Sequence, residues 1–435
     1  MIGLVDCNNF FVSCERLFNP SLNGKAVVVL SNNDGCVISR SNEAKALGIP
    51  MGLPAFKIKE YTNPKNVVKL SCRHVLYKDI SDRIMTLMGS EVENLQIYSV
   101  DECFFTAPYD TDAENYDFMR NLVDKIKRYT GIPVSIGIAP SRTLAKIASH
   151  IAKTKYNDKG NLFLLTNPND FESILKDTPI SDVWGVGRRL TETFHRLQMT
   201  TAYDLSKANI SWIRSQFSIN EERIVRELNG EDCARITTVT DANKSISSSR
   251  TFGSLISDKK TLWESIAYFT ATCAERLRKQ QSATMMISIY IRGDIHNDKT
   301  PFYANSCELR LETPSYDTSY ITQHALKAFN SIYRKGYQYR KAGVVLSHLV
   351  DSSDVQLNLF DKVDIDKQRR LMNALDTVNK YCGKGTLILG AQGLNQKWAP
   401  RKEHIAPQSS ALRIYSGMPI SYPVLDVANT LLDES

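Results

Sequence analysis

The sequence lacks the features of a membrane or secreted protein. None of its apolar runs is long enough to span a bilayer, and no basic and then apolar leader precedes Asp6. Its nine cysteines form no CxxC pair, so the spacing indicates neither a zinc site nor a disulfide framework. The reducing cytoplasm is therefore the expected compartment. A chain of 435 residues, 42% of them hydrophobic, has room for roughly three or four domains.

Positive charge is concentrated in one segment. Residues 244–350 contain 15 Lys and Arg against 8 Asp and Glu, which equals the whole formal net charge of +7. Such a surface suits DNA, because Lys and Arg neutralise phosphates and release counterions. A solvated basic face is the alternative for each residue taken singly. The candidate DNA contacts in this segment are Arg250, Arg276, Arg278, Lys279, Arg340 and Lys341.

The same segment has a regular pattern of alternating strands and helices. Its order, βαββαβ, is that of a ferredoxin-like module. We expect strands near 244–252, 285–292, 306–312 and 342–349, and helices at 262–281 and 320–334.

Three acidic residues follow apolar, strand-like segments. Asp6 ends the opening run of the chain, and the pair Asp101 and Glu102 follows the run 95–100. A sheet could bring all three carboxylates to one edge, where their mutual repulsion would be relieved by a divalent metal. Two hard cations about 3.5–4 Å apart can hold both the attacking and the leaving oxygens of a phosphoryl transfer. Oxygen ligands favour Mg²⁺ over zinc. Acids that merely cap turns are the alternative.

The residues after Asp6 add two adjacent aromatics, Phe10 and Phe11. Together with the segment 99–102 they resemble the palm motifs of Y-family DNA polymerases, the translesion class. The resemblance implies two Mg²⁺ ions and a catalytic set with these ligands: Asp6, the backbone carbonyl of Cys7, Asp101 and Glu102.

The resemblance also places the two aromatics at the incoming nucleotide. Phe11 matches the family's steric gate, because a flat ring under the sugar leaves no volume for a 2′-hydroxyl, and Phe10 precedes it. The alternative is that both rings are core residues at the start of a helix.

Two further segments match the family's contacts to the nucleotide phosphates. The stretch 36–48 is typical of a strand that turns into a short helix ended by Gly48. Its matching positions are Ser39, Asn42 and Lys45, and Asn42 stands where the family usually has a tyrosine. The second segment is an amphipathic helix that ends near Lys153, a point charge for the phosphates. An ordinary helix-dipole partner is the other interpretation of Lys153.

A helix-hairpin-helix signature is present at 184–190. Gly185 and Gly187 flank Val186, and Arg188 follows directly. Such glycines permit a tight turn whose backbone N–H groups bind a DNA phosphate without reading the sequence.

Farther along, residues 356–361 match the bacterial sliding-clamp binding peptide. The matching residues are Gln356, Leu357, Leu359 and Phe360. An exposed apolar peptide needs a partner, and tethering to a clamp would raise the effective concentration at the primer end. A short helix packed on its own domain is the alternative.

Within the Y family, the motifs at 30–38, 182–185, 356–361, 383–387 and 392–393 resemble the UmuC subfamily, the catalytic subunits of bacterial DNA polymerase V. The resemblance covers residues 1–398. It implies primer-template DNA, dNTPs, a UmuD′ homodimer, RecA and the β sliding clamp as partners, and association with the nucleoid.

The fold implied is a multidomain α/β (α+β) right hand with a ferredoxin-like palm. The domains expected are a palm at 1–31 and 80–166, small fingers at 32–79, a helix-hairpin-helix thumb at 167–232, a linker at 233–243, a βαββαβ little finger at 244–350, and a C-terminal region at 351–435 that carries the clamp peptide and a UmuD′-binding segment.

The implied function is error-prone translesion DNA synthesis in SOS mutagenesis, without proofreading. A catalytically silent scaffold bound to DNA and clamp is the main alternative, and the presence of all three acids argues against it. A nucleotidyl cyclase would share the palm, but it needs neither a thumb hairpin nor a basic βαββαβ module.

Overall fold

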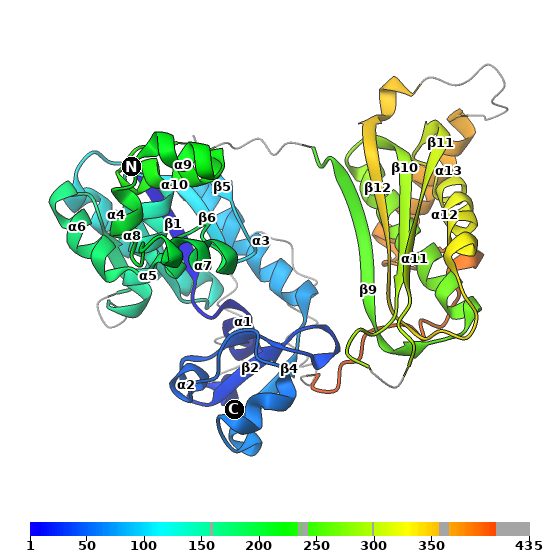
Figure 1. Ribbon diagram of the computed structural model, residues 1–435, viewed down its shortest axis with the longest axis horizontal. Coiled ribbons are helices and arrows are strands. Elements are labelled where there is room, and N and C mark those ends of the chain that lie inside the picture. The colour runs from blue at the N-terminus through cyan, green and yellow to red at the C-terminus, as the bar shows by residue number, and fades with distance from the viewer. Residues whose placement is uncertain (157–159, 234–235, 237–241, 298–299, 356–364, 406–435) are drawn as a thin grey trace. The chain divides into compact units, whose positions relative to one another are not determined.

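The computed structural model describes residues 1–156, 160–233, 236, 242–297, 300–355 and 365–405 (Figure 1). Over these residues, no helix has the length and apolar character needed to cross a membrane. The chain divides into two compact units. The first comprises Met1–Ser31, Gly35–Thr240 and His404–Ser435, and the second comprises Asn32–Asp34 and Asp241–Glu403.

A five-stranded sheet lies at the centre of the first unit, with the order β5-β6-β1-β7-β8. Strand β1 is central and runs antiparallel to both β6 and β7, whereas β8 runs parallel to β7. The strands are β1 (Ile2–Cys7), β5 (Leu95–Ile97), β6 (Glu102–Thr106), β7 (Val134–Ala139) and β8 (Leu162–Leu164).

Helices cover both faces of this sheet. Because side chains alternate along a strand, Val5 and Cys7 join one core and Leu4 joins another. The first core contains residues of α1 (Phe10–Phe18), α3 (His74–Glu91) and α4 (Asp112–Thr130), and the second contains residues of α5 (Arg142–Thr154).

Helix α5 lies unusually close to the sheet. A Cβ atom at Gly137 of β7 would lie 2.2 Å from the backbone nitrogen of Ser149, so only glycine permits this approach. Glu227 fixes the start of α5, because its carboxylate accepts from the N–H and the hydroxyl of Thr143 at 3.0 and 2.6 Å. A carboxylate at a helix N-terminus also favours the helix dipole. The face of α5 is therefore held firmly over β1 and β7.

Two smaller groups of elements complete the first unit. A three-stranded sheet has the order β3-β2-β4. Its strands are β2 (Ala26–Leu30), β3 (Val37–Arg40) and β4 (Val67–Ser71). Short helices precede and connect these strands in the sequence: η1 (Pro20–Leu22), α2 (Asn42–Ala46), η3 (Ala55–Glu60) and η4 (Pro64–Asn66). The helical group comprises α6 (Pro168–Asp177), η6 (Ile180–Asp182), α7 (Arg188–Arg196), α8 (Ala202–Ser206), α9 (Ile210–Gln216) and α10 (Ile219–Leu228).

The second unit is built on a four-stranded antiparallel sheet with the order β11-β10-β12-β9. Strand β12 separates β9 from β10, which makes a split βαβ arrangement. Every predicted element of this module is present, and each strand is longer than predicted. The elements are β9 (Ser245–Ile256), α11 (Lys259–Lys279), β10 (Ser282–Arg292), β11 (Ala304–Ser315), α12 (Thr318–Ile332) and β12 (Tyr339–Asp351).

The C-terminal region packs on the helices of this module. Met372 of α13 (Ile365–Tyr381) is 1% exposed, and its sulfur accepts from the N–H of Thr318. Farther on, Trp398 is 2% exposed and its ring lies 5.1 Å from that of Phe269 in α11. The C-terminal region is thus an added layer of the second unit. Short 3-10 helices also occur in this unit, at η2 (Asn32–Asp34), η7 (Ser352–Asp354) and η8 (Gly390–Gln392).

Candidate active site

The three predicted acids meet at one end of the five-stranded sheet. Asp6 and Glu102 are direct partners in the antiparallel pairing of β1 with β6. Direct partners point to the same face of a sheet, and here that face is the one covered by α5. Asp101 immediately precedes β6, and its carbonyl accepts from the N–H of Cys7 at 2.9 Å. Segments far apart in the chain therefore bring these acids together.

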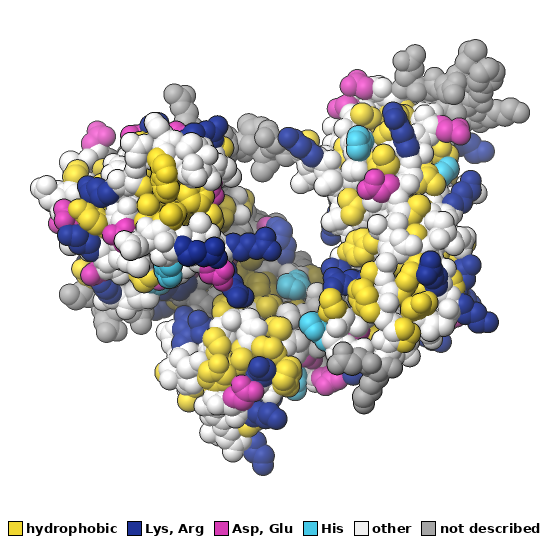
Figure 2. Space-filling model, in the orientation of Figure 1, with side chains coloured by type: hydrophobic (Ala, Val, Ile, Leu, Met, Phe, Trp, Pro, Cys, Tyr) yellow, Lys and Arg dark blue, Asp and Glu magenta, His cyan; other side chains and the backbone are white. Residues whose placement is uncertain are grey.

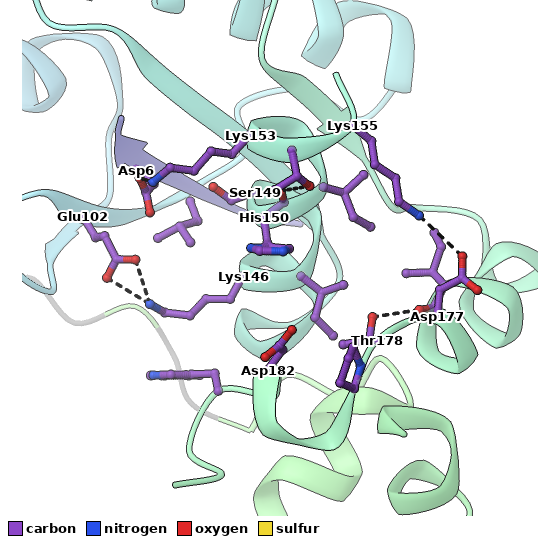
Figure 3. A pocket seen from close by; sticks show the side chains of 17 residues that line it. Asp6, Glu102, Lys146, Ser149, His150, Lys153, Lys155, Asp177, Thr178 and Asp182 are labelled. Atoms are coloured by element: carbon purple, nitrogen blue, oxygen red, sulfur yellow. Dashed lines mark hydrogen bonds and ion pairs between the residues drawn. The ribbon is translucent and has the colours of Figure 1, made fainter. Parts of the chain in front are cut away.

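Two lysines of α5 reach the acids from above the sheet (Figure 3). The ammonium of Lys153 lies 2.5 Å from Oδ1 of Asp6. That of Lys146 lies 3.0 and 2.9 Å from Oε1 and Oε2 of Glu102. Residues seven apart lie on the same face of a helix, about two turns from each other. Lys153 was a predicted site residue, whereas Lys146 was not predicted. Its position seven residues before Lys153 in the amphipathic helix could have indicated that both lie on the same face.

The acids occupy a partly buried, negatively charged setting. Burial raises the pKa of Glu102, the charges of Asp6 and Asp101 raise it further, and Lys146 opposes the shift. Asp101 accepts a hydrogen bond of 2.6 Å from the hydroxyl of Ser99. A cation is therefore favoured at this position, since like charges on adjacent strands repel each other.

The donor set suits magnesium in its chemistry. Three carboxylates and a main-chain carbonyl are all hard oxygen ligands. The thiol of Cys7 is not part of the set, because it is buried on the opposite face and burial raises its pKa. Among the described residues, no three His, Cys, Asp or Glu side chains are placed to share one ion. Asp6 and Glu102 are instead paired with lysines, so these contacts would have to rearrange for a metal ion to bind.

The predicted phosphate-binding residues lie beside this end of the sheet. Asn9, which adopts a left-handed conformation at the start of α1, donates to Asn42 at 2.9 Å, and its carbonyl accepts from Ser39 at 3.4 Å. Burial lowers the pKa of Lys45, and the positive charge of Lys153 lowers it further. Lys45 and Lys153 are therefore electrostatic neighbours. Sequence reasoning missed Asn9, which positions the amide of Asn42.

The two adjacent aromatics have different environments. Phe10 is 3% exposed and belongs to the main core, so the alternative interpretation holds for this residue and it is not available to a nucleotide. Phe11 is half-buried, and its ring stacks on that of Tyr77 at 4.4 Å. The hydroxyl of Tyr77 donates to Glu15 at 2.6 Å, and Glu15 also pairs with Arg73. This network holds the ring of Phe11 in place.

A cavity of about 390 Å³ lies on the α5 side of the acids. Asp6, Glu102, Lys146, His150 and Lys153 line one part of it, as Figure 3 shows. Residues of α6 and of the segment just before the hairpin complete the lining. Asp6 and Glu102 are therefore accessible from this cavity.

Sequence comparison relates the chain to known proteins. The impB/mucB/samB family matches residues 5–150, and the C-terminal domain of that family matches residues 243–359. Protein UmuC of Salmonella typhimurium is 38% identical over 94% of this chain and 97% of its own length. The chain belongs to the impB/mucB/samB family.

Other relatives agree with this placement. Protein MucB of Escherichia coli is 33% identical over 94% of this chain and 96% of its own. DNA polymerase IV of Desulfatibacillum aliphaticivorans is 28% identical over 88% of this chain and 94% of its own. A Y-family DNA polymerase chimera of Dbh and Dpo4 has the same fold, with a TM-score of 0.61, 21% identity, and coverage of 80% of this chain and 99% of the chimera. The predicted Y-family fold, the resemblance to UmuC and the polymerase class of enzyme are confirmed.

The hairpin of this impB/mucB/samB chain matches the family's helix-hairpin-helix motif, which covers residues 168–199. Gly185 has φ of 92°, and a Cβ there would lie 2.8 Å from Cδ1 of Ile224. Gly187 is the N-cap of α7, with open space around its Cα, and the side chain of Arg188 is 92% exposed. The first turn of α7 therefore presents N–H groups and a positive charge at one exposed point.

The predicted basic contacts of the second unit are not equivalent. Figure 2 shows Lys and Arg side chains gathered along one side of this unit on the face in view. Arg250 and Arg276 donate to backbone carbonyls of β9. Three of the remaining four approach side chains: Lys279 pairs with Glu275, Arg340 lies 3.9 Å from Asp294, and Lys341 lies over the ring of Tyr290.

Arg278 is an exception, because its guanidinium is bound within the unit. It donates to both carboxylate oxygens of Asp376 at 2.7 Å and also to the hydroxyl of Thr318 at 2.8 Å. Its side chain is only 9% exposed. Arg278 therefore anchors α13 to α11 and is not retained as a DNA contact. Residues 369–411, which include Asp376, match a domain of unknown function (DUF4113).

We expect Arg278→Met to lower the free energy of unfolding by about 2–3 kcal/mol, because a largely buried bidentate ion pair is broken. Its affinity for DNA should not change. Lys279→Met is the matched comparison, since Lys279 is exposed and its pair with Glu275 contributes little. Denaturant unfolding measures the change in the free energy of unfolding, and DNA titration measures the affinity for DNA. Weaker DNA binding at unchanged stability in Arg278→Met would contradict this assignment.

The predicted clamp peptide, with Gln356, Leu357, Leu359 and Phe360, lies outside the described residues.

Proposed function

We propose that this chain is an error-prone translesion DNA polymerase that adds nucleotides from dNTPs to a primer 3′-hydroxyl with two Mg²⁺ ions. The observation that carries the proposal is the pairing of Asp6 with Glu102 on adjacent strands, with Asp101 one residue away. These residues lie within the part of the chain that matches the impB/mucB/samB family. Cytoplasmic action during SOS mutagenesis, without proofreading, belongs to the same proposal.

Asp6, Asp101, Glu102 and the carbonyl of Cys7 would hold the ions. When bound, two Mg²⁺ ions activate the primer hydroxyl and stabilise the charge of the departing pyrophosphate. Lys45 and Lys153 would offset the negative charge of the phosphates, since the two ammonium groups are electrostatic neighbours. Ser39 and Asn42 would donate to the phosphate oxygens.

The remaining parts would hold the DNA and the partners. The hairpin at Gly185, Gly187 and Arg188 would bind a backbone phosphate, and the basic residues of the second unit would bind the duplex with a strong dependence on salt. The palm, fingers, thumb, little finger and C-terminal region would keep the boundaries predicted above. UmuD′ and RecA are the proposed activating partners, and the β clamp is the proposed tether.

Primer extension on a template with an abasic site tests the proposal. We expect synthesis across the site when UmuD′ and RecA are supplied, with further stimulation by the clamp. Deletion of residues 356–360 should remove only the clamp stimulation, and a stimulation that survives would exclude this peptide. A chain that binds the primer-template but never extends it would support the scaffold instead.

A further inference from the structure

Lys146 occupies the position of a counter-ion to Glu102. Its ammonium contacts both carboxylate oxygens, at 3.0 and 2.9 Å. The side chains of Lys146 and Glu102 are 17% and 18% exposed, so water screens this pair less than it screens a surface pair. Three carboxylates face two lysines at this end of the sheet, which leaves only a small excess of negative charge to attract a divalent ion.

Lys146 also contacts the aromatic residues that lead to the hairpin. Its ammonium lies 4.7 Å from the ring centre of Tyr98 and 5.5 Å from that of Trp184. The indole N–H of Trp184 donates to the hydroxyl of Tyr98 at 3.1 Å, and the two rings meet edge to face. Trp184 immediately precedes Gly185. A cation held against these rings therefore connects Glu102 to the start of the hairpin.

We propose that Lys146 is a positioning residue that holds Glu102 while the site is free of metal and gives it up when metal binds, and that this exchange alters the environment of Trp184. The inference rests on the proposed function. Lys146 occupies a lone-pair direction on each oxygen of Glu102, and its ammonium would repel a divalent ion bound to the same carboxylate at short range. Lys146 therefore weakens metal binding, most strongly when the negative charge of a nucleotide is absent.

Lys146 differs from Lys153 in this respect. Lys153 contacts a single oxygen of Asp6 and lies near Lys45, so it has a second role at the phosphates. Lys146 is instead enclosed by Glu102, Tyr98 and Trp184. Its removal should therefore affect metal affinity in the absence of nucleotide.

Mn²⁺ titration of the full-length protein, without DNA or nucleotide, tests the exchange, with free Mn²⁺ measured by electron paramagnetic resonance. We expect Lys146→Gln to bind Mn²⁺ about tenfold more tightly than the wild type, because a competing cation is removed. Lys146→Arg, which keeps the charge, should resemble the wild type, and Glu102→Gln should bind more weakly.

The three variants separate the two proposals. Unchanged or weaker Mn²⁺ binding by Lys146→Gln, together with a loss in Glu102→Gln, would overturn the exchange and leave the metal assignment intact. Unchanged binding in Glu102→Gln would instead remove Glu102 from the metal site and contradict the proposed function.

Tryptophan fluorescence tests the connection to the hairpin. We expect titration with Mg²⁺ to change the emission of the wild type, and we expect the change to be lost in both Trp184→Phe and Lys146→Gln. The wild type and Lys146→Arg should respond alike. A full response in Lys146→Gln would show that Trp184 does not sense the release of Lys146, and this part of the inference would then be wrong.

Discussion

Asp101→Asn should reduce primer extension by about 10³-fold or more, while affinity for primer-template DNA stays near that of the wild type. Asparagine has nearly the same shape as aspartate but lacks the charge that binds a divalent ion. Among the described residues, Asp101 pairs with no lysine, and its carboxylate accepts from the hydroxyl of Ser99. The substitution would therefore remove a proposed metal ligand without breaking an ion pair with a described residue.

Single-turnover extension of a labelled primer measures this effect. Glu172→Gln is the matched control, since Glu172 lies on α6 in an exposed pair with Lys176 that contributes little. The control should extend the primer at the wild-type rate. Persistent synthesis by Asp101→Asn would show that this carboxylate is not needed for the chemistry.

Phe11→Ala should allow ribonucleotides into the products, with a fall in selectivity for deoxyribose of about 10²-fold. The ring of Phe11 is fixed by its stacking on Tyr77, which is itself held by Glu15. Because the ring cannot easily move aside, it would exclude a 2′-hydroxyl by its volume if the sugar lies against it, as proposed. Its removal opens space at the sugar while leaving the acids in place.

The adjacent aromatic is a demanding control for this prediction. Phe10 is buried in the core, so Phe10→Leu should cost about 1 kcal/mol of stability and leave sugar selectivity unchanged. Incorporation of ATP and dATP opposite template thymine measures selectivity in both variants. Unchanged selectivity in Phe11→Ala would exclude Phe11 as the steric gate.

Local patterns predicted much of the fold. The sequence predicted that Asp6, Asp101 and Glu102 would meet at one edge of a sheet, but not how they do so. Asp6 lies near the end of β1 as predicted, whereas Glu102 is the first residue of β6, and the antiparallel pairing of β6 with β1 brings the two together. The βαββαβ order of the second unit was also predicted, because its strands and helices have distinct periods. Strand ends were underestimated, since polar residues such as Ser245 and Ser315 continue the backbone pairing beyond the apolar stretch.

Long-range pairing of side chains was not predictable in the same way. Nothing around Arg278 indicates that Asp376, almost 100 residues later, will bind it. The charge count could not distinguish this anchor from an exposed residue such as Lys279. The spacing of Lys146 from Lys153 could have placed it on the same face of α5, but its pairing with Glu102 depends on the close approach of α5 to the sheet at Gly137. Phe10 and Phe11 are adjacent in sequence, and only the packing of α1 separates a core ring from a half-buried one.

The metal-binding role of the three acids is best tested by a crystal structure of the protein with primer-template DNA, a non-hydrolysable dNTP and Mn²⁺, using anomalous scattering. We expect two anomalous peaks between the triphosphate and the carboxylates of Asp6, Asp101 and Glu102, with Lys146 withdrawn from Glu102. Peaks bound by other residues, with Asp6 still on Lys153 and Glu102 still on Lys146, would contradict this assignment.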